Sequence, residues 1–366
     1  MLQNEKESLT VSVVMPIRNE ANYIAACIDS LLCQDYPMSD MEWIFVDGCS
    51  TDNTKEIIQS YIDRYPNLIK LYDNPGKTVP YAMNIGIPKS RGKYIVRLDA
   101  HSEYAPDYIS KSVYYLDHTD ADNVGGIMIT RAKTKIGQRI ALMLSCSFGV
   151  GNAKFRINGN DGYVDTVPFG TFRREAFDKY GLFDERLTRN QDNEMNWRIR
   201  KNGGKIYMSK DIKLTYYCRD SISTINKMAF INGKWNIITM RICPGSMGAR
   251  HFIPLLFLLS LVVMPILSVL FWPFALLFAA ELGLYSLLDL IFSVKCAAQA
   301  ENDNKFLCFL TLLILFPMFH ISYAFGSIMG LCALCTRKFR RDFLKHNNSK
   351  KNNDVSSEKK EESLVK

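Results

Sequence analysis

The stretch VSVVMPIRNE, residues 11–20, decides the fold, because an apolar run of strand length passes directly into polar residues and then into a helical pattern. Over residues 20–33 the apolar side chains recur at the spacing of one helix face. The same order of strand and helix returns at 43–65, 68–90 and 94–117. Such alternation is typical of βαβ units, whose strands lie parallel in one sheet. We therefore expect an α/β fold with a mostly parallel, Rossmann-like sheet.

Three of the four predicted strands end in an aspartate, at Asp47, Asp73 and Asp99. Ligands of open parallel sheets bind at the carboxyl ends of the strands. We therefore expect the functional site at this edge of the sheet.

The second half of the soluble region contains a loop and one clear helix. Residues 149–162 are rich in Gly and Asn and predict a loop or lid. A helix is expected to begin at Asn190, which would be its N-cap, and to end at Gly203. Glu194 and Arg198 are four residues apart, so we expect them to pair on this helix.

The composition is that of a folded protein with a membrane region. Of the 366 residues 48% are hydrophobic and 22% are charged, which excludes a disordered or collagen-like chain. Nearly all long apolar runs lie after residue 252: residues 252–294, divided at Trp272-Pro273, are long enough for two membrane helices, and 306–335 for a third. The predicted parts are a polar segment at 1–10, an α/β domain at 11–221, an interfacial amphipathic segment at 222–251, transmembrane helices at 252–336 and a basic, disordered tail at 337–366.

The charges around the apolar runs conflict with three full crossings. The N-terminus lacks the pattern of a signal peptide and the ten cysteines show no disulfide framework, so we expect the first domain in the cytoplasm. Arg337, Lys338, Arg340 and Arg341 follow the last apolar run and are also expected to stay cytoplasmic, whereas three crossings would place them outside. Either Pro317 divides the last run into a re-entrant or interfacial pair, or the number of crossings before it is not two.

The sequence DGCSTD at 47–52 stands where a predicted strand ends and a helix starts. Carboxylates and backbone N–H groups converge at such a junction, and a nucleobase is a natural partner for them. The alternative is a simple turn and helix cap, because the same residue types are favoured there for local reasons. The chain has no G-x-G-x-x-G, and Gly76-Lys77-Thr78 lacks the upstream glycine of a P-loop, so dinucleotide and P-loop chemistry are disfavoured.

Asp99 and His101 stand two residues apart at the end of another predicted strand, where both side chains can face one crevice. A divalent cation bound to phosphates would fit them. Mg²⁺ prefers oxygen ligands and imidazole suits softer ions, so His101 favours Mn²⁺ or a hydrogen-bonding role without ligation. The alternative is an ordinary pair of residues with no ligand.

The sequence QDNE at 191–194 opens the helix predicted to follow Asn190. The helix dipole keeps a carboxylate in the first turn ionised, so Asp192 could accept a proton. An Asp of ordinary pKa is a weak base toward a sugar hydroxyl, so we expect the proton to move while the new bond forms. Helix capping by acidic residues is the alternative.

Taken in order, these motifs resemble the family 2 glycosyltransferases of the GT-A fold. The matching motifs are PIRNE at 16–20, DGCSTD at 47–52, RLDAH at 97–101 and QDNE at 191–194. The D-A-H variant and the appended apolar helices look most like the succinoglycan-type membrane-bound glucosyltransferases of bacterial exopolysaccharide synthesis. The resemblance therefore implies a GT-A catalytic domain followed by an α-helical membrane region.

The resemblance also implies an inverting transfer from a nucleotide-sugar, expected to be a UDP-hexose. The positions that match donor-binding residues are Pro16, Arg18, Glu20, Asp47, Lys77 and Asp99. Asp99 and His101 match the D-x-D that holds a divalent cation, Mn²⁺ or Mg²⁺, with the histidine in place of the second acid. Asp192 matches the general base, and the residues expected on the acceptor and lipid side are Gln191, Lys234 and Trp235.

We expect the acceptor to be a hydroxyl of a lipid-linked saccharide, because the apolar helices keep the site near the membrane. The expected location is the bacterial inner membrane, with several membrane passes and the catalytic domain on the cytoplasmic side. Transfer to polyprenyl phosphate is one alternative, and a nucleotide-binding scaffold or transporter built on Glu281, Asp289 and His320 is another. A nucleic-acid partner is not expected, because five of the eight surplus positive charges lie from Arg337 onward, where they meet anionic lipid.

Overall fold

The computed structural model describes residues 9–157, 159–301 and 303–336. Within them, nine strands form one sheet in the order β3-β2-β1-β4-β8-β6-β9-β5, and β7 pairs with β9. The strands are β1 Val11–Ile17, β2 Met41–Asp47, β3 Ile69–Asp73, β4 Tyr94–Arg97, β5 Ser102–Tyr104, β6 Asn123–Arg131, β7 Gly162–Tyr163, β8 Thr171–Arg173 and β9 Ile206–Tyr217. The predicted tail at 337–366 and residues 1–8 of the predicted polar segment lie outside the described residues.

Strands β1 to β4 confirm the Rossmann-like part of the prediction. β1 lies between β2 and β4 and is parallel to both, and β2 is parallel to β3. Parallel neighbours need crossover connections, which the helices α1 Ile24–Leu32, α2 Thr54–Arg64 and α3 Val79–Lys89 provide. Every residue of β1, β2 and β4 is buried, as expected for strands covered on both faces.

The other half of the sheet is mixed, which the sequence pattern did not predict. β8 is antiparallel to both β4 and β6, whereas β6 is parallel to β9. β5 and β7 are antiparallel to β9. Strands as short as Thr171–Arg173 and Gly162–Tyr163 are too short to show a period of two, so the pattern missed them.

The remaining helices surround this sheet and extend beyond it. They are α4 Tyr108–His118, α5 Lys135–Leu144, α6 Ser147–Val150, α7 Arg174–Tyr180, α8 Gln191–Lys201, α9 Ile222–Ile242, α10 Ile253–Leu270, α11 Pro273–Ala298 and α12 Lys305–Cys335, with 3₁₀ turns at Met38–Asp40 and Ala249–Phe252. The predicted loop at 149–162 is irregular over most of its described length, although α6 reaches Val150 and β7 begins at Gly162.

Helix α8 begins directly after Asn190, as predicted. Glu194 and Arg198 pair at 2.8 Å, and Gly203, with a φ of +83°, follows the end of the helix. Asn190 is the N-cap residue, as predicted, but its side chain forms no capping hydrogen bond. Asn190 has a φ of +63°, and its side-chain amide donates instead to two side chains of α9.

Three hydrophobic clusters hold the chain together. The first packs α1, α2 and α4 on one face of the sheet around Trp43 and Tyr108, and the second packs α3, α7 and α8 on the other face around Ile44 and Phe177. The third joins α5 to α9, α11 and α12 around Phe316. The apolar helices are therefore packed against the α/β domain through this third cluster.

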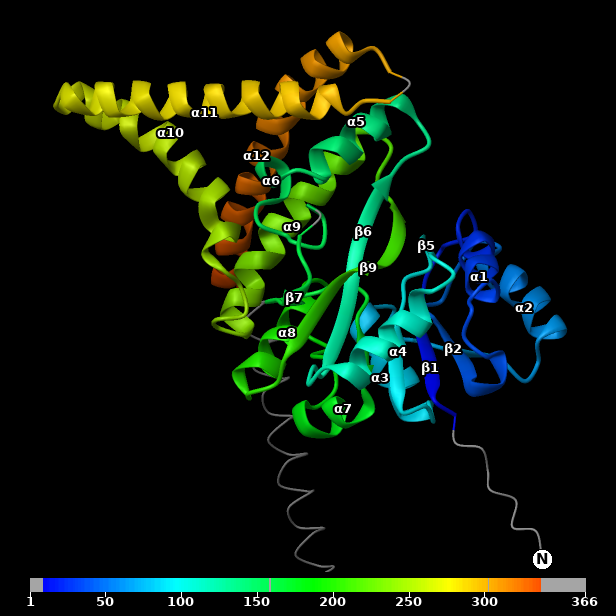
Figure 1. The fold of residues 1–366 in the computed structure, drawn as a ribbon. Coiled ribbons are helices and arrows are strands. Elements are labelled where there is room, and N and C mark those ends of the chain that lie inside the picture. The colour runs from blue at the N-terminus through cyan, green and yellow to red at the C-terminus, as the bar shows by residue number, and fades with distance from the viewer. Residues whose placement is uncertain (1–8, 158, 302, 337–366) are drawn as a thin grey trace, which may run out of the picture.

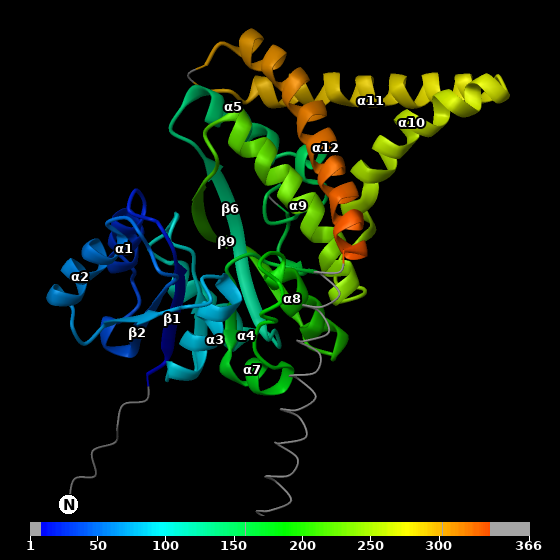
Figure 2. The same ribbon diagram turned by 180° about the vertical axis from the view of Figure 1, so that it is seen from behind.

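Among the described residues, three helices are long and apolar enough to cross a membrane, spanning Ala249–Leu270, Pro273–Ala298 and Lys305–Cys335. The predicted division at Trp272-Pro273 is confirmed. The alternative in which Pro317 divides the last run is wrong, because α12 continues as one helix through Pro317. Figures 1 and 2 show α10 and α11 projecting from the body of the protein, while α12 runs side by side with α9.

Candidate active site

The candidate site lies at the carboxyl ends of the parallel strands, where the sequence placed it. Asp47 is the last residue of β2, and Asp99 follows β4 by two residues. Asp192 lies in the first turn of α8, and the side chain of Arg97 lies between Asp192 and Asp99.

The loops after β1 and β2 are held together by hydrogen bonds. Asp47 is fully buried, and its carboxylate accepts bonds from the Ser50 hydroxyl at 2.5 Å and the Ser50 backbone N–H at 3.0 Å. The Asn19 N–H donates to the Ser50 hydroxyl at 2.9 Å, and the Thr51 N–H donates to the Asn19 side chain at 2.8 Å. Asp47 therefore fixes the shape of this loop, and direct contact with a nucleobase stays a prediction.

The other residues predicted on the donor side differ in exposure. Pro16 is buried within β1, whereas Arg18 is exposed and lies against Gly48. Lys77 is exposed and has a φ of +60°. Neither Arg18 nor Lys77 forms an ion pair within the part of the chain that the structure describes, so both cations are free to meet an anionic ligand.

The structure brings Glu20 to the predicted cation ligands. His101 Nδ1 lies 2.9 Å from Asp99 Oδ1 and 3.4 Å from Glu20 Oε1, and one ligand atom of each residue lies within 4.8 Å of the others. His101 Nδ1 is buried and faces both carboxylates, and a cation bound there would take the place of the proton on this nitrogen. We call Glu20, Asp99 and His101 the cation set, and it fits a divalent ion with two oxygen ligands and one nitrogen ligand.

Neighbouring charges outweigh the effect of burial on the pKa values of Asp99 and His101. Burial alone would raise the pKa of Asp99, but His101 and Arg97 lower it to about 2. Burial alone would lower the pKa of His101, but Asp99 and Glu20 hold it well above its ordinary value. Without a cation, the histidine supplies the positive charge that the two carboxylates need.

Arg97 links the cation set to the predicted base, and the sequence analysis did not assign it a role. Its guanidinium lies 3.6 Å from Asp192 Oδ2 and 3.9 Å from Asp99 Oδ2, and the side chain is 3% exposed. It also lies 4.7 Å from the centre of the Phe169 ring. The available signal was its position two residues before Asp99, because alternate residues of a strand share a face.

The surroundings of Asp192 shift the pKa of its carboxyl upward. Burial raises the pKa of its carboxyl, Arg97 opposes this rise, and Asp99 adds to it. The side chain keeps 27% of its surface exposed, so an acceptor hydroxyl can reach it. The direction of this shift differs from the ordinary pKa that the sequence analysis assumed, and its main cause is burial.

Helix α9 borders the start of α8 on the predicted acceptor side. Arg189 donates to Asn232 at 3.2 Å, and Asn190 donates to Asn236 at 2.7 Å. Lys234 and Trp235 belong to this same stretch of α9, and both are partly buried. The predicted third member, Gln191, is buried at the start of α8.

Two arginines that the sequence analysis missed lie near the site, Arg156 beside Tyr216 and Arg189 beside α9. The Arg156 guanidinium lies 5.3 Å from the centre of the Tyr216 ring, and that ring lies 5.2 Å from the His101 ring. Burial lowers the pKa of Arg156 and of Arg189, and the charge of Arg219 lowers that of Arg189 further, while Tyr216 acts against the lowering of both. Within the described residues neither Arg156 nor Arg189 forms an ion pair, so the two charges lack an acidic partner.

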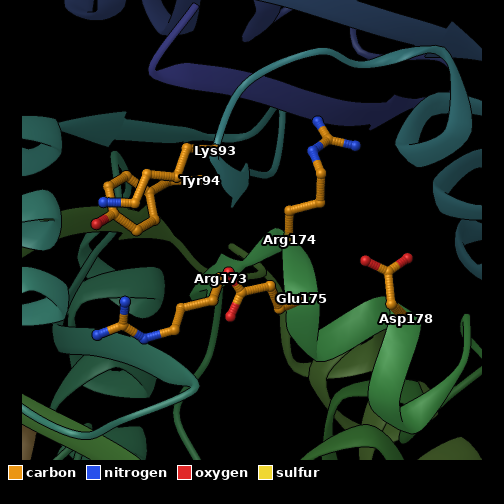
Figure 3. A pocket seen from close by; sticks show the side chains of 6 residues that line it. All are labelled: Lys93, Tyr94, Arg173, Arg174, Glu175 and Asp178. Atoms are coloured by element: carbon orange, nitrogen blue, oxygen red, sulfur yellow. The ribbon is translucent and has the colours of Figure 1, made fainter.

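A separate pocket of about 150 Å³ lies at the opposite edge of the sheet. Figure 3 shows its lining side chains, which come from the amino end of β4 and from β8 and α7: Lys93, Tyr94, Arg173, Arg174, Glu175 and Asp178. It contains none of the predicted site residues. We therefore do not include it in the candidate site.

Comparisons with known proteins define the class of this enzyme. Over 87% of its length the chain matches 86% of the structure of the mannosyltransferase PcManGT from Pyrobaculum calidifontis in complex with GDP-Man and Mn²⁺, with a TM-score of 0.54 and 18% identity. The fold is therefore GT-A, as predicted. Curated glycosyltransferases also match in sequence, and the chain is a glycosyltransferase.

The family follows from the sequence matches. Residues 12–181 match the model of glycosyl transferase family 2, and the chain carries a catalytic domain of this family. The succinoglycan biosynthesis protein ExoA of Rhizobium meliloti is 29% identical over 70% of this chain and 77% of that protein. A dolichyl N-acetyl-alpha-D-glucosaminyl phosphate diacetamido-dideoxy-glucuronosyltransferase of Methanococcus voltae is 25% identical over 88% of this chain and 97% of that protein.

The enzyme class excludes the non-catalytic scaffold or transporter. The three residues on which that alternative rested have local partners: Glu281 accepts a bond from Ser260, Asp289 from Ser293, and His320 bonds to Tyr285 and to the backbone oxygen of Phe148. Each of the three polar groups is therefore satisfied by a hydrogen bond within a helix or between helices.

Proposed function

We propose that this glycosyltransferase transfers a sugar, with inversion, from a UDP-hexose to a hydroxyl of a lipid-linked saccharide in the synthesis of a cell-surface polysaccharide. The observation that carries this proposal is the position of Asp192. Arg97 connects its carboxylate to the cation set on one side, and on the other side α9 joins the start of α8 to the apolar helices.

The cation set supports a nucleotide-sugar donor. Glu20, Asp99 and His101 would hold Mn²⁺ or Mg²⁺, and the imidazole favours Mn²⁺. Such an ion would stabilise the negative charge that develops on the departing nucleoside diphosphate. Arg18 and Lys77 are exposed at the same edge and can contact the same phosphates.

Inversion needs one base on the side opposite the leaving group. The acceptor oxygen forms a bond to the anomeric carbon, the bond from that carbon to the diphosphate oxygen breaks, and the hydroxyl proton passes to the Asp192 carboxylate. A raised pKa makes Asp192 a better proton acceptor than a solvent-exposed aspartate. Arg97 keeps the carboxylate ionised before the proton arrives.

The lipid-linked acceptor is supported by the helices and by the unpaired arginines. The Methanococcus voltae relative is named for a dolichyl sugar phosphate, and that name describes that protein. Here Arg189 lies at α9 and has no acidic partner within the described residues, so it can meet the phosphate of a lipid carrier. Gln191, Lys234 and Trp235 are proposed to contact the acceptor saccharide and its lipid.

The location that we propose is the inner membrane of a bacterium, with the catalytic domain in the cytoplasm. The ten cysteines, all within the described residues, are free thiols, which supports a reducing compartment.

Replacement of Asp192 by Asn tests the proposal. We expect turnover to fall by about a hundredfold to ten-thousandfold, as is typical for the loss of a general base, while nucleotide affinity stays the same. Asp178→Asn, which removes a carboxylate from an exposed position on α7, is the matched control and should keep full turnover. Unchanged turnover in Asp192→Asn would refute the base and favour polyprenyl phosphate as acceptor, because a phosphate acceptor has no hydroxyl proton to lose.

A further inference from the structure

Helix α9 contacts the catalytic domain at both of its ends. The backbone oxygen of Asp220, just before α9, accepts a bond of 3.3 Å from the Thr134 hydroxyl at the start of α5. Near the other end, Asn236 and Thr239 accept bonds from Asn190 at the start of α8. A helix held at both ends by one water-soluble domain lies along that domain and does not cross a membrane.

Helix α12 follows the same course, although its composition is that of a membrane span. Just before it, Asp303 receives two hydrogen bonds from Arg139 of α5, at 2.7 and 3.0 Å. In its middle, His320 lies 2.9 Å from the backbone oxygen of Phe148 in α6. Further along, Gly326 and Gly330 lie so close to α9 that an added side chain would meet the backbone oxygens of Phe230 and Lys234.

These contacts extend farther than a bilayer is thick. From Lys305, the first residue of α12, to Gly330 the helix advances by 330 − 305 = 25 residues, which is about 38 Å, and Asp303 lies just before it. The hydrocarbon core of a bilayer is about 30 Å thick. If α12 crossed the membrane, one end of these contacts would lie on the side opposite the catalytic domain, yet both ends touch that domain or the helix attached to it.

Helices α10 and α11 behave differently, because their contacts with the catalytic domain lie toward their outer ends. The innermost is that of Tyr285 in α11, whose ring centre lies 5.6 Å from that of Phe148 in α6. Before α10, Arg250 donates to Asp165 at 2.9 Å, and near the end of α11 the Cys296 thiol lies 3.9 Å from the backbone oxygen of Leu142. Between these points the two helices project away from the body (Figures 1 and 2). At their junction Val269 is 88% exposed and Trp272 is 68% exposed. Large apolar side chains exposed along both helices suit contact with lipid chains.

We propose that, of these helices, α10 and α11 alone enter the hydrocarbon core. They form a hairpin that crosses the membrane and crosses back, so that both of its outer ends lie on the side of the catalytic domain. Helices α9 and α12 lie against the domain at the membrane surface. Phe306, Ile314 and Phe325 of α12 are more than half exposed and would face the lipid. Thr336, the last described residue, then lies on the same side as the catalytic domain.

This arrangement removes the conflict in the sequence analysis. With an even number of crossings before α12 and none by α12, the described chain ends on the side of the catalytic domain. This is the side on which the rule for positive charges expects the basic sequence that follows. In this proposal two crossings precede α12, as the sequence predicts, and the expectation that changes is the crossing by α12 itself. The inference concerns only how the chain lies in the membrane, so it stands whether or not the proposed donor and acceptor are correct.

Reporter fusions to the full chain test the inference. Green fluorescent protein, which fluoresces in the cytoplasm, and alkaline phosphatase, which is active only outside it, are attached in separate fusions to residue 1 and to residue 366. We expect the two ends to give the same reporter response, normalised to the amount of fusion protein in the membrane. Opposite responses at the two ends would overturn the inference. As a control for sensitivity, a known single transmembrane helix inserted between Lys366 and the reporter should reverse the response at that end.

Discussion

Replacement of Arg97 by Met tests how the site keeps its base ionised. The substitution keeps most of the volume of the buried side chain and removes its charge. The guanidinium lies 3.6 Å from the Asp192 carboxylate, and at an effective dielectric constant of about 20 such a pair interacts by about 4 to 5 kcal/mol. Because Asp192 is 27% exposed, water screens part of this energy, and we expect an effect of about 1 to 2 kcal/mol.

The expected result is a loss in kcat/KM that depends on pH. An effect of about 1 to 2 kcal/mol corresponds to about a fivefold to thirtyfold loss. Arg97 lowers the pKa of Asp192, so its removal raises that pKa and protonates the base at pH values where the wild type is active. The loss should therefore be greatest at acidic pH, and activity should recover as pH rises.

The assay is sugar transfer measured across pH, with nucleotide binding and thermal unfolding as controls for the donor site and the fold. Arg97→Lys keeps a positive charge and should restore most of the wild-type acid limb. An acid limb in Arg97→Met that coincides with that of the wild type, in a folded protein, would refute the role assigned to Arg97.

Three further predictions concern the cation, the acceptor and the packing of the last helix. Glu20→Gln should weaken Mn²⁺ binding by at least about tenfold, measured by calorimetry with the metal alone, because even the loss of a residue that only supports a metal ligand has an effect of this size. The control Asp73→Asn, at the exposed end of β3, should leave Mn²⁺ binding unchanged. Arg189→Ala should raise the KM for a lipid-linked acceptor by about tenfold, the effect of one charge-assisted hydrogen bond, and a matching loss of nucleotide affinity would assign this arginine to the donor instead. Asp303→Asn should lower the stability in detergent by about 3 kcal/mol, seen as a lower melting temperature, because it leaves the charge of Arg139 buried without its partner; an unchanged melting temperature would contradict this.

Much of the candidate site could be predicted because its residues follow strands directly. Asp99 and His101 are two residues apart, and the sequence predicts that both face one crevice. The structure has their side chains 2.9 Å apart, in the short turn between β4 and β5. Glu20 was predicted on the donor side, but its contact with His101 depends on how the loop after β1 folds over the end of β4. Arg97 belongs to the motif RLDAH, but the sequence does not predict that its side chain lies between two carboxylates, because this depends on where α8 packs.

The sequence by itself determined the local elements: the alternating strands and helices, the start of α8 at Asn190 and the break at Trp272-Pro273. Each is set by residues close together in the chain, through apolar periodicity, the left-handed backbone conformation that asparagine tolerates, and proline. Only the tertiary structure decided the antiparallel insertion of β8 into the sheet and the packing of α12 along α9. Hydropathy measures how apolar a helix is, and a helix buried against a protein and a helix in lipid have the same composition. The contacts at Asp303 and Gly330 distinguish them, because they join residues far apart in the sequence.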